Sequence, residues 1–195
     1  MLKAIFTIIV SLSGWGKVLY DYLSSKPKIR AQVFQVMRGQ MSLSGTSDEK
    51  MTAFFTYAYL VNRRKNFIHI LDYELEIKFK NVWQKLKRVY GIHRIQDPHF
   101  IDPSGKEIKI RNFQDNLIYR KGRPVEYGTP LHGWVVFAGN QDLHNADISE
   151  FKLTCIDAFQ GRHRIRTKSN KLASLEQLQD LADIQIPETA RTNSP

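Results

Sequence analysis

A chain of 195 residues, 42% of them hydrophobic and 25% charged, is long enough to bury one self-sufficient core. Its formal net charge of +10 favours an anionic partner without identifying one. Its single cysteine, Cys155, excludes an intrachain disulfide.

The first 24 residues are predicted to form an apolar helix. The run AIFTIIVSL (4–12) is short, and only its continuation to Leu23 reaches the roughly 20 residues that cross a bilayer. Small and polar residues share one stripe of this helix, which suits either a spanning or an interfacial anchor. We therefore predict a membrane anchor, bound to the lipid bilayer, that also offers a contact for homo-oligomers. Its apolar side chains are Ile5, Phe6, Ile8, Ile9, Leu12 and Trp15.

Two alternatives to the anchor stay open. Lys3 followed by Ser11-Leu12-Ser13 fits a cleaved signal peptide, although the helical pattern continues past Ser13. The same segment also fits a helix packed on its own soluble domain. If it is an anchor, the basic residues between Lys17 and Arg30 place the following domain in the cytoplasm by the positive-inside rule.

The next segments indicate antiparallel β-strands. Residues 29–37 alternate loosely, and residues 39–50 form a polar loop. The segment FFTYAYL (54–60) is apolar on both faces, which is typical of a central, buried strand. Residues 67–79 alternate strictly between apolar and charged side chains, which predicts a strand with one buried and one wet face.

A β-hairpin is predicted after this strand, because Asn81 tolerates the positive φ of a two-residue turn. Pairing Phe79 with Val82 makes the facing residues match in charge or polarity, which stabilises cross-strand pairs. The matched pairs are Leu75 with Leu86, Glu76 with Lys85, and Glu74 with Lys87.

The rest of the chain completes an all-β pattern. Strands are expected at 107–110, 130–138, 149–157 and 162–167, with a helical turn at 112–120 and a hairpin that pairs Phe159 with Arg162. Leucines at helical spacing predict a closing amphipathic helix. Seven or eight short strands predict an antiparallel, Ig-like β-sandwich. The predicted organisation is a helix (1–24), the β-sandwich (25–168), a C-terminal helix (169–185) and a disordered tail (186–195).

No motif for catalysis or metal binding rises above chance. The six histidines include no HxH, HxxxH or HExxH pair, and the chain lacks GxGxxG, P-loop and GxSxG sequences. Cys155 alternates into the predicted core, which indicates an unreactive thiol. We therefore expect no catalytic residue, no metal and no cofactor.

The predicted binding surface is the loop 118–132, where basic residues precede the stiffening Pro124. Arg and Tyr are over-represented at interface hot spots. We expect this loop to meet an acidic protein or anionic lipid head groups. Most aromatic residues alternate into the core, which argues against nucleic acid. The candidate residues are Tyr119, Arg120, Lys121, Arg123, Tyr127 and His132.

Four segments carry a resemblance: GWGKVLYDYL, HILDYELEIKF, NLIYRKGRPVEYGTPLHGW and KLTCIDAF. In this layout the chain resembles small bacterial membrane-anchored proteins with an Ig-like β-sandwich, and the resemblance implies architecture only. The leading hypothesis is a membrane-anchored, non-enzymatic interaction module with a basic surface. The alternative is an exported ligand-binding domain or enzyme released by signal-peptide cleavage.

Overall fold

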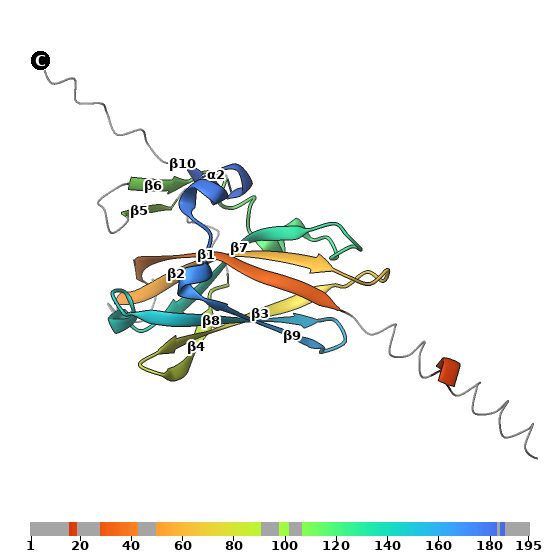
Figure 1. Cartoon of the computed structure of the whole chain (residues 1–195). Coiled ribbons are helices and arrows are strands. Elements are labelled where there is room, and N and C mark those ends of the chain that lie inside the picture. The colour runs from red at the N-terminus through yellow and green to blue at the C-terminus, as the bar shows by residue number, and fades with distance from the viewer. Residues whose placement is uncertain are drawn as a thin grey trace, which may run out of the picture.

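The computed structural model describes residues 16–18, 28–42, 50–90, 98–101, 107–182 and 184–185. These residues form a mainly β, antiparallel fold (Figure 1). A seven-stranded sheet has the strand order β1-β2-β7-β4-β3-β8-β9, and a three-stranded sheet has the order β10-β6-β5. The strands are β1 (Ile29–Ser42), β2 (Lys50–Asn62), β3 (Ile70–Phe79), β4 (Val82–Arg88), β5 (His99–Ile101), β6 (Glu107–Ile110), β7 (Leu131–Gly139), β8 (Ile148–Asp157), β9 (Arg162–Lys168) and β10 (Ile184–Gln185). The helices are η1 (Ile118–Lys121), η2 (Gln141–Leu143), η3 (Ser169–Lys171) and α2 (Leu175–Ala182).

The large sheet curls into an incomplete barrel. Strand β4 turns the corner, because residues 82–86 pair with β3 whereas Lys87 and Arg88 pair with β7. The two ends of the sheet, β1 and β9, therefore come side by side (Figure 1). The predicted Ig-like sandwich is wrong, since a sandwich needs two separate sheets packed face to face. Alternation along a strand reports which face is buried, and it does not report whether the sheet is continuous.

Strand β2 is buried on both faces, as its sequence predicted. Phe54 and Leu60 point into the barrel core. Phe55 and Tyr57 lie on the outer face of the sheet, in a second core shared with the small sheet and α2. This second core explains why the segment carries no polar face, because residues of β5, β6 and α2 cover the side that would otherwise meet water.

The first predicted hairpin is confirmed and the second is wrong. Phe79 pairs with Val82, and Lys80 and Asn81 form the turn with φ of 49° and 62°. In the β8–β9 hairpin, however, Arg162 pairs with Ile156. The buried Asp157 accepts hydrogen bonds from the backbone N–H groups of Phe159 and Gly161, each at 2.8 Å. This carboxylate stabilises a turn of residues 157–161, which is longer than the two-residue turn that the matching of side chains predicted.

The structure corrects the predicted transmembrane helix. Within the described residues, no helix is both long and apolar enough to cross a bilayer. The longest described α-helix, α2, has eight residues, where about 20 are needed. The predicted span reached that length only by continuing past the charged Lys17 and Asp21. Residues 16–18 are helical, and the rest of the segment 1–24 lies outside the described residues, as does the tail 186–195.

Candidate functional site

The segment that leads into the loop predicted to bind a partner lies beside β7, where Leu117 and Trp134 form an isolated parallel bridge. Trp134 donates its backbone N–H to the carbonyl oxygen of Asn116 at 2.8 Å. A Cβ atom on Gly133 would lie 2.4 Å from that same oxygen, so only glycine allows this approach. Gly122, with φ of 58°, then ends η1, and the residues after it pair with Ile68 and Asn62. Lys121 and Arg123, on either side of Gly122, lie close enough to His132 for their charges to act on its ring.

Hydrogen bonding and ring stacking fix the orientation of the His132 ring. Tyr57 donates its hydroxyl proton to the carbonyl oxygen of Leu181 at 2.6 Å, so its oxygen accepts from Nδ1 of His132, also at 2.6 Å. The ring also stacks on Tyr59 at 15°. Burial lowers the pKa of His132, and the positive charges of Lys121 and Arg123 lower it further. The hydrogen bonds therefore fix the Nδ1–H tautomer.

The six predicted site residues do not form one surface. Lys121, Arg123 and His132 interact electrostatically. Tyr119 instead packs on the guanidinium of Arg88, 5.2 Å from its ring centroid. Tyr127 is 59% exposed and lies beside Asn62, while Arg120 is exposed on η1. Binding by this loop stays a prediction.

A second basic surface lies where β1 and β9 meet, and we call it the β1–β9 seam. Two adjoining hollows of about 390 and 400 Å³ run along it. Their floor is apolar, made by the half-buried Ile29, Ala31 and Ile165. Their rim is basic and exposed. The rim residues are Lys28, Arg30, Arg63, Arg164, Arg166, Lys168 and Lys171.

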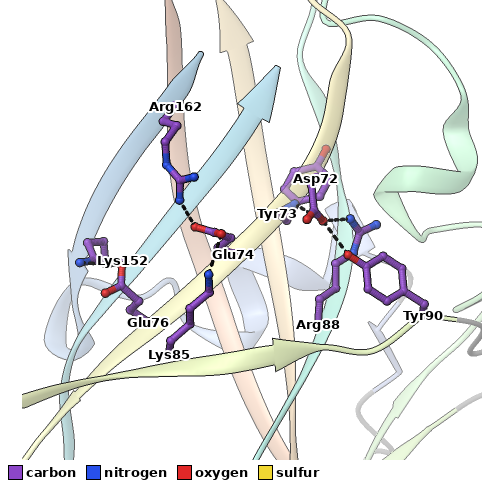
Figure 2. Close-up of polar contacts among 9 residues, drawn as sticks. All are labelled: Asp72, Tyr73, Glu74, Glu76, Lys85, Arg88, Tyr90, Lys152 and Arg162. Atoms are coloured by element: carbon purple, nitrogen blue, oxygen red, sulfur yellow. Dashed lines mark hydrogen bonds and ion pairs between the residues drawn. The ribbon is translucent and has the colours of Figure 1, made fainter. Parts of the chain in front are cut away.

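The acidic residues on the wet face of β3 are already paired. Glu74 of β3 lies between Lys85, at 2.7 Å, and Arg162 (Figure 2). Glu76 contacts Lys152 at 2.6 Å, and Asp72 binds Arg88 and Tyr90.

Positive charge therefore accumulates at the seam. Among the described residues that line the hollows, Glu150 is the acidic one, and Lys78 forms an ion pair with it at 3.1 Å. Within the described part of the chain, no ion pair reaches Arg30, Arg164 or Lys168.

The sequence contained one signal for this surface. Arg162, Arg164, Arg166 and Lys168 recur with period two, which puts them on one face of a strand. Lys28 and Arg30 have the same spacing about 130 residues earlier. The local sequence of each strand does not show that the two strands are the edges of one sheet. The seam was therefore not predicted.

One constellation looks catalytic and is not. Cys155 faces His163 across the β8–β9 pair, and Nε2 of His163 lies 2.8 Å from Oδ2 of Asp157. Burial, however, raises the pKa of the Cys155 thiol to about 12, and the side chain has no exposed surface. A thiol so placed is neither ionised at neutral pH nor open to a substrate. Asp157 acts instead as the anchor of its turn.

The described residues contain no group of three or more His, Cys, Asp or Glu side chains that could hold a metal ion. No protein-family model and no curated protein matches the chain. Among solved structures, it is similar to a Bacillus subtilis protein titled "putative lipoprotein (ycdA)", with 9% identity over 74% of this chain and a TM-score of 0.43. The chain spans 38% of the length of that protein, and a likeness of this extent carries no argument about function.

Proposed function

We propose that this chain is a non-enzymatic binding module that holds an anionic partner along the β1–β9 seam. One observation carries the proposal: an exposed basic rim surrounds an apolar floor between two strand edges, and Glu150, the acidic residue in the described lining, is already paired with Lys78. Ordinary surfaces mix both signs of charge, so a rim of one sign needs a further explanation.

The charges of the rim act together. Charges separated by less than the Debye length, about 8 Å at physiological ionic strength, are not fully screened from one another. An elongated anion lying in the seam contacts residues from both β1 and β9 at once. The apolar floor adds burial of side-chain surface to this attraction, which favours a partner with apolar as well as acidic groups.

A direct test measures binding of a fluorescent, glutamate-rich peptide to the full chain by anisotropy. Binding is expected to weaken steeply as salt is raised, because ionic contacts at exposed residues are screened. The triple substitution Arg30→Ala, Arg164→Ala and Lys168→Ala should reduce the affinity about tenfold or more. These side chains are exposed, so the melting temperature should not move.

The matched control removes the same charge elsewhere. Lys65, Lys87 and Arg111 are exposed basic residues that do not line the seam. Changing these three to alanine lowers the net charge equally and should affect the affinity much less. Equal losses in the two triple variants would show a general charge effect, and the proposal for the seam would fail.

A further inference from the structure

The direction of the strands at the seam is the starting point. Each pair of neighbours in the seven-stranded sheet is antiparallel. Because the number of strands is odd, the first and the last, β1 and β9, run parallel to each other. The lining of the hollows agrees, since residues 28–31 lie opposite 164–166, and residues 30–32 lie opposite 165–168.

The two edges approach each other without pairing. Their Cα atoms come within 8 Å, yet no ladder joins β1 to β9 in the described chain. Direct closure would need a parallel ladder, whose slanted hydrogen bonds are less stable per residue than antiparallel ones. One more strand, antiparallel to both edges, would instead complete an eight-stranded barrel in which every pair is antiparallel. Eight strands enclose an interior just wide enough for side chains to fill.

We propose that the partner is an extended acidic segment of another protein, which inserts as this eighth strand between β1 and β9. The inference rests on the proposed function and specifies the form of the bound partner. Addition of a strand to an exposed sheet edge is a general mode of peptide recognition, in which backbone hydrogen bonds supply affinity and side chains supply specificity.

The chain itself shows that the edge of β1 accepts an extended segment. Ala173 donates its backbone N–H to the carbonyl oxygen of Phe34 at 2.7 Å, and its own carbonyl oxygen accepts from Nε2 of Gln35 at 3.1 Å. This contact lies at the irregularity between Val33 and Gln35, where Phe34 has no partner on β2. The chain before it, residues 28–32, lines the hollows.

The side chains around the seam specify the pattern of the inserted strand. Inward residues of that strand would meet the floor of Ile29, Ala31 and Ile165, so they should be apolar. Outward residues would meet the basic rim, so they should be Asp or Glu. The expected sequence therefore alternates acidic and apolar residues.

Other partners fit the seam less well. A second copy of a chain with a net charge of +10 would be repelled. A bilayer surface offers head groups to the rim, but it has no N–H and C=O ladder for the two edges. Nucleic acid would gain little stacking, because the described residues that line the hollows include no aromatic side chain.

Insertion needs the seam to widen. A strand between two neighbours requires about 9.5 Å from edge to edge, twice the usual strand spacing. The closest Cα atoms of β1 and β9 lie within 8 Å, so the edges must separate on binding. Hydrogen exchange of the β1 and β9 amides should therefore slow in the complex, since these groups become paired.

The test uses the acetylated and amidated peptide Thr-Glu-Val-Glu-Val-Glu-Thr and two N-methylated versions of it. N–H groups of alternate residues in a strand point to opposite sides. Methyl groups on the glutamate nitrogens therefore block pairing with one edge, and methyl groups on the valine nitrogens block pairing with the other. All three peptides keep the same charge. Insertion predicts that each methylated version binds at least tenfold more weakly than the parent.

Each outcome decides between the two proposals. Weaker binding of only one methylated peptide would mean that the strand adds to a single edge, and the proposed closure of the barrel would be wrong. Equal, salt-dependent binding of all three peptides, lost in the Arg30, Arg164 and Lys168 variant, would overturn the strand and leave the anion-binding function standing. Binding of phosphatidylserine vesicles without any binding of the peptides would overturn the peptide partner. No binding of any acidic probe would overturn the proposed function itself.

Discussion

Ala173 forms hydrogen bonds with Phe34 and with Gln35, which lies 138 residues before it in the sequence. These bonds mark the end of the β1–β9 seam along β1. The backbone N–H of Ala173 reaches the carbonyl oxygen of Phe34 at 2.7 Å. The segment that follows η3 therefore covers part of the edge of β1, while residues 28–32 line the hollows. One edge strand thus has a part paired within the chain and a part that faces the seam.

Ala173→Pro should weaken this contact. Proline has no N–H to donate, and Leu172 already has the extended conformation, φ −65° and ψ 147°, that a following proline requires. We expect the free energy of unfolding in urea to fall by about 1 kcal/mol. Ala173→Ser keeps the N–H and serves as the control. Equal stability of the two variants would show that the hydrogen bond contributes nothing.

The ion pairs on the wet face of β3 give a second prediction (Figure 2). Glu74→Lys with Glu76→Lys removes the contacts to Lys85 and Lys152 and places like charges together. The loss of stability should be roughly 1–2 kcal/mol in sum.

Rescue identifies the true partners of these glutamates. Adding Lys85→Glu and Lys152→Glu should restore most of the stability, measured by urea unfolding. Adding Lys87→Glu should restore little, because the described contacts give Lys87 no ion pair with Glu74. Recovery with Lys87→Glu alone would contradict the observed geometry.

The β3–β4 hairpin shows which features of the structure could be predicted from the sequence and which could not. Its register followed from local residues, because the turn at Lys80-Asn81 and the facing side chains agree. The ion pairs did not follow, since Glu76 reaches Lys152 on β8, a strand that enters from about 75 residues away. The same limit applies to the fold as a whole. Alternation located the strands, but the order that makes β1 and β9 the two edges depends on pairing between distant segments.

His132 should make stability depend on pH. Its pKa in the folded protein lies below the ordinary value of about 6.5, so the unfolded chain binds a proton more readily. Stability is therefore fully present above that value and declines as pH falls below it. His132→Asn keeps an N–H for the Tyr57 oxygen and has no titrating group. The fall in melting temperature between about pH 8 and pH 5 should be smaller in this variant. Identical pH profiles would rule out a contribution from His132.

Cys155 should resist thiol reagents in the folded protein. Its side chain is fully buried, and burial raises its pKa to about 12. A maleimide at neutral pH should therefore react only as fast as the barrel opens, and modification should accelerate in urea. Fast reaction in native buffer would place the thiol in an accessible site and reopen a nucleophilic role.

The loop at Arg120, Lys121 and Arg123 provides the last prediction, because it separates the two basic surfaces. Lys121 and Arg123 lower the pKa of His132, so changing both to alanine should raise that pKa toward its ordinary value, as measured by NMR titration. Arg123 also donates to the carbonyl oxygen of Pro130 at 3.2 Å, in an exposed position where a hydrogen bond contributes little stability. The melting temperature of a variant with alanine at Arg120, Lys121 and Arg123 should therefore stay unchanged.

Binding then assigns the surface. If the loop meets the anionic partner, as the sequence predicted, the Arg120, Lys121 and Arg123 variant should bind the glutamate-rich peptide more weakly and with less dependence on salt. If the seam is the binding surface, this variant should bind like the parent chain, while the Arg30, Arg164 and Lys168 variant loses affinity. Because both variants remove three positive charges, a loss confined to one of them cannot come from net charge alone. A loss confined to the loop variant would return the site to the residues between Ile118 and His132 and would contradict the assignment of the seam.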